Sequence, residues 1–474
     1  MVNSVSERAI DVIYAMEQGS LSAVELLNDT YRRIESLNPA LNAICTLVPF
    51  DTAVIEAERV DAARRRGESL PALAGLPIAV KDLAETRGIR TTFGSKLFSE
   101  HVPEQDCLLV ERLRAAGAII IGKTNTPEFG AGSHTFNEVF GTTRNPYDTS
   151  LSAGGSSGGA ASALAAGMLL IADGSDMGGS LRNPASFCNV VGMRPSLGRI
   201  PTWPQTQSRA KRMGVEGPMA RNVEDCALLL QALAGPDPRD PHSVDSALPN
   251  VGMHRKPEPG PLKLAWSPRP ASLPVEPDVN STLTATLTNL PRSDFIIEET
   301  SLEIFSNAME IFKVMRAVAY AELLGTLHAD NPGVFKSTLA GNIEEGLMVE
   351  PHQIIRAEEE RQRTLLAIEA LFQEFDYLLL PAAQVTPFPV EWEYPKSIDG
   401  MAMHSYIDWM SCCCITSPFD LPSVSIPAGF TDAGLPVGLQ IVGKYGDDWG
   451  VLQAAYSMQE QAPFWQQHPP VWDT

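Results

Sequence analysis

From Leu76 onwards the chain alternates short apolar runs with segments of helical periodicity, and this alternation limits it to few folds. The runs 76–80 (LPIAV) and 118–121 (AIII) have the length of buried strands, whereas 107–116 repeats apolar residues at helical spacing. Such alternation is typical of an α/β protein. Strand-like runs return in the second half of the chain, at 262–266, 377–380, 423–426 and 437–442. We therefore predict one large sheet that receives strands from both halves.

The beginning of the chain differs, because its apolar residues follow a helical period only, as in Ala23, Leu26, Leu27, Tyr31 and Ile34. We interpret residues 1–70 as an N-terminal helical segment that packs on a core of residues 71–474. A Pro- and Gly-rich stretch near 235–261 is interpreted as a surface connection within that core. Three further helices are expected, at 304–324, at 352–375 and, buried, at 160–172.

The formal net charge of -21 argues against a protein that binds nucleic acid, because phosphate binding requires concentrated Lys and Arg. Two short basic stretches, 64–66 and 209–212, are interpreted as solvated surface. The first residues carry charges where a signal peptide would be apolar, and no run reaches the roughly 18 apolar residues of a membrane span. We expect a cytoplasmic protein that binds neither nucleic acid nor membrane.

The seven cysteines form an odd set without CxxC spacing, which predicts neither a disulfide framework nor a zinc site. A reducing compartment fits this pattern. The run 412–414 (CCC) invites interpretation as a metal site, but adjacent residues cannot readily close around one ion. Buried neutral thiols are the preferred interpretation, and no metal is expected.

Two glycine-rich loops that present serine, 154–159 (GGSSGG) and 174–182 (GSDMGGSLR), lie on either side of an apolar segment. Glycine leaves backbone N–H groups uncovered, and such donors hold either a phosphate or the oxyanion of a hydrolase intermediate. A phosphate site would need a basic residue beside the loop, and none is present. The literal P-loop pattern at 117–124 (GAIIIGKT) has a buried strand in place of a flexible loop, which argues against nucleotide binding.

A serine nucleophile needs an activating base, and none of the eight histidines stands in a recognisable hydrolase setting. The pattern GxSxG at 154–158 lacks the preceding apolar strand of a nucleophile elbow. Lys81 is the remaining candidate, because it directly follows a buried apolar run and burial would favour its neutral amine. The alternative is a lysine at a strand end that reaches solvent or pairs with Asp82. Local sequence alone favours this alternative.

The wider pattern favours the catalytic interpretation, because these segments resemble the amidase signature family of serine hydrolases, in which a lysine and two serines form the catalytic triad. The match consists of 76–82 (LPIAVKD), 122–128 (GKTNTPE), 145–146 (NP), 154–159, 176–184 (DMGGSLRNP), 192–196 (GMRPS) and 217–219 (GPM). More loosely, 421–427 (LPSVSIP) and 434–438 (GLPVG) extend it to nearly the whole chain. The resemblance implies one large α/β domain with a central mixed sheet covered by helices on both faces.

The resemblance assigns a role to each residue of the triad. Ser180 becomes the nucleophile, Ser156 the proton relay and Lys81 the general base. In related enzymes an unusual cis peptide bond holds the relay serine. The implied reaction is hydrolysis of a carbon–nitrogen amide bond through an acyl-enzyme on Ser180, and it requires no metal or organic cofactor.

Further roles concern the surroundings of the triad. The oxyanion hole would consist of the backbone N–H groups of Met177, Gly178, Gly179 and Ser180. Gly130, through its main chain, and Ser156 would contact the substrate. Ser157 matches a supporting serine, and Asp176 and Arg182 match structural positions. Many relatives carry threonine in place of Met177, a departure that keeps the N–H donor but bears on specificity.

The substrate is predicted only as a class, a small-molecule amide. Five aromatic residues near the motifs hint at an aryl or apolar acyl pocket, with ordinary core packing as the alternative: Phe129, Phe136, Phe140, Phe187 and Trp203. We expect a free-standing amidase, and the sequence is compatible with a homodimer. One alternative is the glutamine-hydrolysing subunit of a tRNA-dependent amidotransferase, which shares all three triad residues. The other is a catalytically silent binding protein with the same fold.

Overall fold

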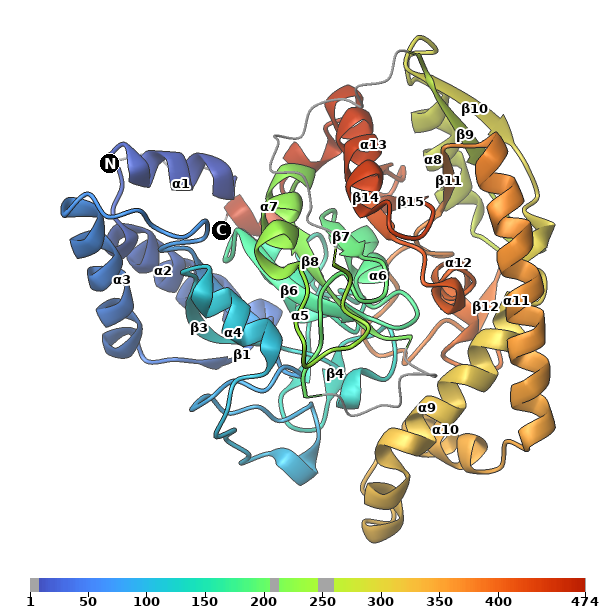
Figure 1. The fold of residues 1–474 in the computed structure, drawn as a ribbon, viewed down its shortest axis with the longest axis horizontal. Coiled ribbons are helices and arrows are strands. Elements are labelled where there is room, and N and C mark those ends of the chain that lie inside the picture. Colours follow the sequence, from blue (N-terminus) through green and yellow to red (C-terminus); the bar gives the residue numbers. More distant parts are fainter. Residues whose placement is uncertain (1–7, 205–212, 246–259, 474) are drawn as a thin grey trace.

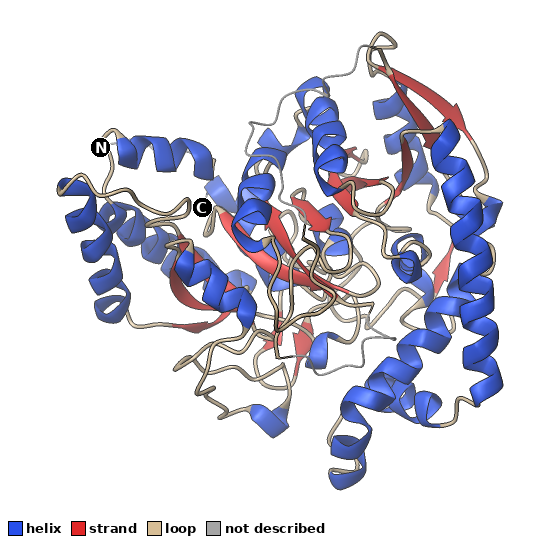
Figure 2. Ribbon diagram, viewed as in Figure 1, coloured by secondary structure: helices blue, strands red, loops and turns tan. Residues whose placement is uncertain are grey.

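The structure is a computed structural model that describes residues 8–204, 213–245 and 260–473. A mixed sheet of eight strands lies at its centre (Figure 1, Figure 2). In spatial order the strands are β10 (Phe295–Glu299), β9 (Leu262–Trp266), β11 (Tyr377–Pro381), β15 (Pro436–Val442), β14 (Ser423–Phe430), β7 (Val191–Arg194), β8 (Val215–Ala220) and β6 (Ile171–Asp176). The β9 pairs with β10 and β11 are parallel, and all others are antiparallel. The predicted α/β class and the sheet built from both halves of the chain are confirmed.

A second, smaller sheet holds the two apolar runs predicted as strands in the first third of the chain. Its order is β1 (Ile44–Leu47), β3 (Ile119–Thr124) and β2 (Pro77–Lys81), with β2 parallel to β3. These strands therefore do not enter the large sheet. Instead the N–H of Lys81 donates to the carboxylate of Asp173 in β6, at 3.1 Å. This contact places the end of β2 against the edge of the large sheet.

Helices α1 (Ala9–Glu17), α2 (Ala23–Leu41), α3 (Phe50–Arg65) and α4 (Leu108–Ala115) occupy one end of the molecule, around the smaller sheet (Figure 1). The apolar residues that the sequence places at helical spacing lie on the buried face of α2. Its N-terminus is closed by a capping box in which Ser22 and Glu25 each bond the other's backbone N–H. The division at residue 70 stays a prediction, because α2 and α3 pack on each other as well as on the smaller sheet.

The remaining helices cover the large sheet and form the opposite end of the molecule. They are α5 (Gly158–Ala165), α6 (Arg182–Phe187), α7 (Val223–Leu233), α8 (Pro277–Thr288), α9 (Ala308–Asp330), α10 (Ser337–Leu347), α11 (Pro351–Glu374), α12 (Ser411–Cys414) and α13 (Asp448–Gln461). Gly438 of β15 lies against Ser186 of α6, whereas Gly443 lies against Val451 of α13. Because alternate residues of a strand face opposite sides, α6 and α13 cover different faces of the sheet.

One predicted helix is shorter than expected. The apolar window 160–172 is helical only as far as Ala165, where α5 ends. Gly167 follows with φ of +69°, a left-handed conformation that glycine adopts without strain, and β6 begins at Ile171. The window therefore combines a helix and a strand, both buried, which hydrophobicity alone does not separate.

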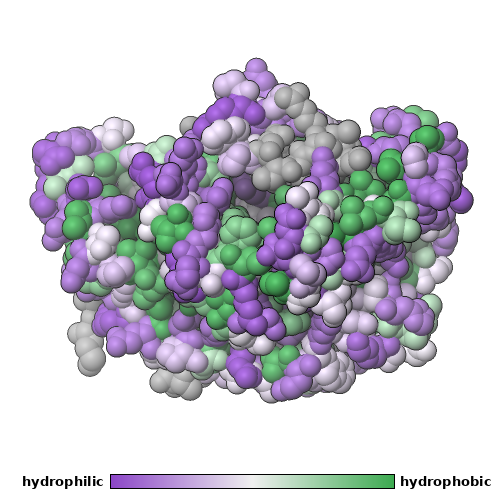
Figure 3. Space-filling view, turned by 90° about the horizontal axis from the view of Figure 1, so that it is seen from below, coloured by the Kyte–Doolittle hydropathy of each residue, from purple (hydrophilic) through white to green (hydrophobic). Residues whose placement is uncertain are grey.

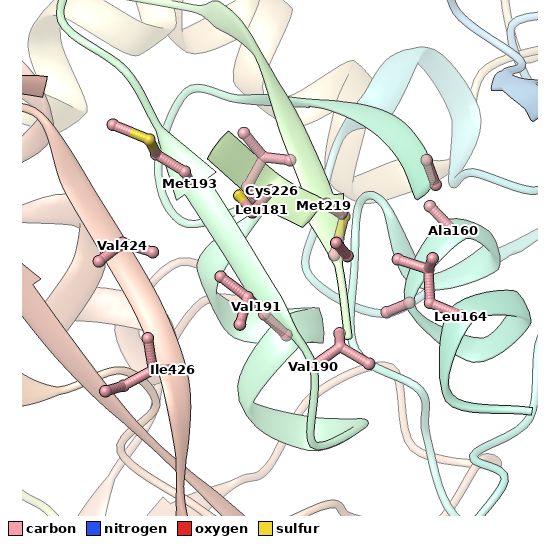
Figure 4. Close-up of a cluster of buried hydrophobic side chains, with 14 of the residues drawn as sticks. Ala160, Leu164, Leu181, Val190, Val191, Met193, Met219, Cys226, Val424 and Ile426 are labelled. Carbon is pink, nitrogen blue, oxygen red and sulfur yellow. The ribbon is translucent and has the colours of Figure 1, made fainter. Parts of the chain in front are cut away.

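The core lies between the large sheet and its helices. Figure 4 shows part of it, with Ala160 and Leu164 of α5, Val191 and Met193 of β7, Met219 of β8, and Val424 and Ile426 of β14. Two short hairpins complete the strands, formed by β4 (Phe136–Asn137) with β5 (Gly141–Thr142) and by β12 (Ser397–Ile398) with β13 (Met401–Ala402).

The face seen in Figure 3 carries hydrophilic residues with smaller hydrophobic areas between them. Within the described ranges, no helix combines the length and the apolar character that a bilayer crossing requires. In the same ranges, no group of three or more His, Cys, Asp or Glu side chains is placed to hold a metal ion. The basic stretch 209–212 and much of the predicted surface connection near 235–261 lie outside the described residues.

Candidate active site

Lys81 is the last residue of β2, and only 1% of it is exposed. Its Nζ lies within hydrogen-bonding distance of three hydroxyl oxygens, those of Ser156 at 2.7 Å, Ser157 at 2.9 Å and Ser175 at 3.0 Å. Burial lowers the pKa of this amine to about 7, although the carboxylates of Asp173 and Asp176 favour its charged form. A large share of the amines is therefore neutral near pH 7 and able to accept a proton.

The alternative interpretation of Lys81, a solvent-reaching or Asp82-paired lysine, does not hold. The carboxylate of Asp82 instead accepts hydrogen bonds from the N–H and the hydroxyl of Thr92. The neighbouring Lys123, which belongs to the P-loop-like pattern, is fully buried in β3 and donates to Ala84 O and to the Thr86 hydroxyl. Both lysines are thus enclosed, but only Lys81 faces the serine loops.

The first glycine-rich loop brings Ser156 to Lys81, and the peptide bond between Gly155 and Ser156 is cis. A side chain at Gly155 would place its Cβ 3.0 Å from the backbone N of His134, so only glycine fits without a shift. Gly130 approaches from the other side, with φ of +68°, and a Cβ built there would lie 3.5 Å from Ser156 Oγ. Because Gly130 has no side chain, its main chain can lie close to the relay hydroxyl.

Ser180 stands at the end of the second glycine-rich loop, between β6 and α6, and is 7% exposed. The two loops are joined by a backbone hydrogen bond from Ser157 N to Ser180 O, at 3.1 Å. Within the described part of the chain, the hydroxyl of Ser180 makes no hydrogen bond. It is therefore available to a substrate.

A buried ion network fixes the turn that carries Ser180. Arg182 binds the Asp176 carboxylate through two hydrogen bonds, of 2.9 and 3.0 Å, and Arg194 lies 3.5 Å from the same carboxylate. Burial alone would raise the pKa of the Asp176 carboxyl, but these two guanidinium groups hold the pKa well below its usual range. The carboxylate also accepts the N–H of Leu181 at 3.1 Å. Asp176 therefore organises the loop from its buried side.

The same carboxylate changes the predicted oxyanion hole. The N–H of Gly179, one of the four predicted donors, already donates to Asp176 Oδ1 at 2.8 Å. Among the described residues, the N–H groups of Met177, Gly178 and Ser180 have no acceptor. Three of the predicted donors are therefore available to an oxyanion, and the fourth is engaged because it closes the turn.

Comparison with known proteins identifies the family. The model of the amidase family matches residues 25–452. This chain belongs to the amidase signature family. Curated relatives of this family member include a glutamyl-tRNA(Gln) amidotransferase subunit of Moorella thermoacetica, 36% identical over 97% of this chain and 96% of the relative. The protein of the same name from Synechococcus sp. strain CC9605 is 33% identical over 96% of each chain.

The fold of this family member is similar to solved structures of several differently named proteins. A bacterial aryl acylamidase of the amidase signature family superposes with a TM-score of 0.88, at 26% identity, over 97% of each chain. A glutamyl-tRNA(Gln) amidotransferase subunit of Thermotoga maritima superposes with a TM-score of 0.76, at 24% identity, over 93% of this chain and 92% of that one. Both matches support the fold.

The five aromatic residues proposed for an acyl pocket do not come together. Phe187 stacks with Trp409 in the core, and Phe140 and Trp203 each lie beneath an arginine. Phe129 precedes Gly130 and packs with Phe335 in a cluster that also contacts Met177. Only Phe129 and Phe136 lie near the segment at Gly130, which borders the triad. The ring of Phe136 lies 5.2 Å from Lys336 Nζ. For the other three, core or surface packing is the correct interpretation.

Two residues around Lys81 were not predicted. Ser175 provides the third hydroxyl at Nζ, and Asp173 accepts the backbone N–H of Lys81. Both belong to β6, directly before the loop of the nucleophile. The sequence pointed to Ser175 only in part, because this residue stands within the second glycine-rich loop motif. That Ser175 faces the lysine is shown only by the contact between β2 and β6.

Proposed function

We propose that this chain hydrolyses a carbon–nitrogen amide bond, with Ser180 as nucleophile, Ser156 as proton relay and Lys81 as general base. The observation that carries the proposal is the buried amine of Lys81, 2.7 Å from Ser156 Oγ and with a pKa lowered to about 7. An amine in this state can remove a proton from a hydroxyl, which an ordinary surface lysine does poorly at neutral pH. The complete triad also disfavours a catalytically silent binding protein.

The proposed reaction moves one proton along the triad in each direction. Neutral Lys81 takes a proton from Ser156, which takes one from Ser180, and the Ser180 oxygen attacks the amide carbonyl. The N–H groups of Met177, Gly178 and Ser180 support the negative oxygen, each contributing about 3 kcal/mol as in other hydrolases. Ser156 then gives a proton to the leaving nitrogen, and the carbon–nitrogen bond breaks. Water releases the acyl group by the reverse sequence.

An activity panel tests this proposal. Purified chain should release amine or ammonia from at least one of a set of aliphatic amides, aryl acetamides, carbamates and amino-acid amides. The variant Ser180→Ala should lose this activity by several orders of magnitude while keeping the thermal unfolding midpoint of the wild type. Equal turnover by wild type and Ser180→Ala would remove Ser180 as nucleophile.

A second candidate function is glutamine hydrolysis within a tRNA-dependent amidotransferase. The names of curated relatives that match over nearly the whole chain favour it. The structural match to the aryl acylamidase, at 26% identity over 97% of each chain, supports the free-standing enzyme. Small-molecule amides hydrolysed by the chain alone would favour the free-standing enzyme. Glutamine hydrolysis that appears only with added amidotransferase partner proteins would favour the second candidate.

We propose further that the chain acts in the cytoplasm, with a small-molecule amide as substrate and without a bound cofactor. Sedimentation of the purified protein measures whether it forms a homodimer. A monomer with full activity would show that self-association is not required.

A further inference from the structure

A buried histidine that the proposed reaction does not use lies beside the relay loop, residues 152–158. His134 is 2% exposed. Its Nε2 lies 3.0 Å from Val390 O, and its Nδ1 lies 2.7 Å from Ser152 Oγ. Both ring nitrogens therefore have a partner, and one of the partners belongs to the loop that carries Ser156.

The two contacts fix which nitrogen of the ring carries the proton. Burial lowers the pKa of His134 to about 4, so the ring is neutral near pH 7 and carries one N–H. A backbone carbonyl only accepts hydrogen bonds, so the proton lies on Nε2, which donates to Val390 O. Nδ1 is then an acceptor, and the hydroxyl of Ser152 donates to it. The direction of this hydroxyl is therefore set by the histidine.

Two aromatic side chains hold the imidazole in this orientation. Its ring centre lies 5.0 Å from that of Phe136 and 5.6 Å from that of Phe388. Phe388 also packs edge-on against Trp409 in the core, and its carbonyl accepts the N–H of Ser152 at 2.8 Å. The segment that packs on the ring therefore also bonds the relay loop.

The oriented hydroxyl of Ser152 closes the beginning of the relay loop. Its Oγ accepts the N–H of Gly154 at 3.0 Å, two residues before Ser156. Because the hydroxyl proton points to Nδ1, the lone pairs of this oxygen are left for the N–H of Gly154. One chain of hydrogen bonds therefore runs from Gly154 through Ser152 and His134 to Val390 O.

The residue after the histidine holds the loop on both sides of Ser156. The N–H of Thr135 donates to Gly154 O at 3.0 Å, and its hydroxyl accepts the N–H of Gly158 at 3.1 Å. The position of Ser156 Oγ, 2.7 Å from Lys81 Nζ, therefore depends on how this segment holds the relay loop.

A serine hydroxyl that donates to an imidazole is also the arrangement of a serine nucleophile and its base. Ser152, however, is 0% exposed, and its oxygen already accepts an N–H of its own loop. A substrate carbonyl cannot reach this oxygen. The pair of Ser152 and His134 therefore supports the relay loop and does not form a second catalytic centre.

We propose that His134 is a positioning residue for amide hydrolysis, which acts through the Ser152 hydroxyl to fix the loop that presents Ser156. This inference rests on the proposed function and adds a residue that acts on the relay and not on the substrate. In the proposed reaction Ser156 gives a proton to the leaving nitrogen, so a displaced relay slows the departure of an amine. Departure of p-nitrophenolate is affected less, because this group leaves as an anion without a proton.

The test compares two substitutions, each of which keeps one hydrogen bond of the ring. Asparagine carries Oδ1 at the place of Nδ1 and keeps the acceptor for Ser152, whereas glutamine carries Nε2 at the place of the ring Nε2 and keeps the donor to Val390 O. The assay is the ratio of kcat/KM for an amide that wild type hydrolyses to kcat/KM for the p-nitrophenyl ester of the same acid. His134→Gln should lower this ratio by about 10- to 100-fold, because a misplacement of about 1 Å costs up to about 100-fold. His134→Asn should keep a ratio close to that of wild type. A ratio within one sample does not depend on how much of a variant is folded.

Substitutions of serine test whether the hydroxyl transmits the effect. Ser152→Ala should lower the ratio as His134→Gln does, and the double variant should lower it no further, because the hydroxyl that the histidine orients is then absent. The matched control is Ser150→Ala, which removes an exposed hydroxyl that donates to Asp148 at 2.7 Å and should leave the ratio unchanged. A wild-type ratio in His134→Gln, equal losses in the asparagine and glutamine variants, or losses that multiply in the double variant would each overturn the positioning role.

A measurement without substrate separates failure of the positioning role from failure of the proposed function. Hydrogen exchange of the peptide 152–158, followed by mass spectrometry, should be faster in His134→Gln than in wild type and His134→Asn. Faster exchange in His134→Gln, with no amide hydrolysed by wild type, would keep the hydrogen-bond chain and reject the hydrolase. Amide hydrolysis together with wild-type exchange and a wild-type ratio in His134→Gln would keep the hydrolase and reject the positioning role.

Discussion

The pH dependence of amide hydrolysis follows directly from the environment of Lys81. The amine acts as a base only when neutral, and with a pKa of about 7 roughly half of the molecules hold it neutral at pH 7. An exposed lysine, with a pKa near 10.4, would be neutral in only about one molecule in 2,500. Burial therefore raises the active fraction about a thousandfold. Below pH 6, kcat/KM should fall about tenfold for each pH unit, and above pH 8 it should level off.

The assay is kcat/KM for an uncharged amide measured between about pH 5 and pH 9, because a substrate that does not titrate leaves only groups of the free enzyme. Circular dichroism at each pH serves as the control that the chain stays folded. A profile that is flat over this range, or that rises only towards pH 10, would refute the argument that burial prepares Lys81 as the base.

Three substitutions test the supports of the site. Arg182→Met leaves the Asp176 carboxylate without its main partner and should lower the free energy of unfolding by about 3–5 kcal/mol, measured by urea denaturation; an unchanged midpoint would contradict this. Gly130→Ala places a methyl group 2.9 Å from Leu83 Cδ1 at a positive φ, so it should lower the free energy of unfolding by about 1–2 kcal/mol in the same assay and also lower kcat/KM. Wild-type values of both quantities would show that the site tolerates a side chain there. Ser175→Ala removes a hydroxyl that accepts from the catalytic ammonium group and should shift the acid limb of the pH profile to lower pH, whereas a shift to higher pH would show that the hydroxyl plays another part.

The elements that the sequence predicts best are those with a strong local pattern. The runs 76–80 and 262–266 contribute to the strands β2 and β9, and the helical period of the first 65 residues corresponds to α1 to α3, apart from the strand β1 between α2 and α3. Sequence patterns do not assign strands to sheets, because pairing depends on partners far along the chain. The separate three-stranded sheet that carries Lys81 was missed for this reason.

The candidate site shows the same limit. The lysine and the two serines follow from linked motifs, but the engagement of the Gly179 N–H depends on how the Asp176 side chain folds back on its own turn. Phe312 of α9 belongs to no motif. Its position beside the site depends on the packing of α9 against the segment at Gly178, over 130 residues earlier in the chain.

The most direct test of the account is to map where a serine-directed fluorophosphonate binds. After reaction and proteolysis, mass spectrometry should find the adduct on Ser180, and Lys81→Met should react slower by orders of magnitude because the nucleophile loses its base. An adduct on another residue, or equal rates for wild type and Lys81→Met, would contradict the triad.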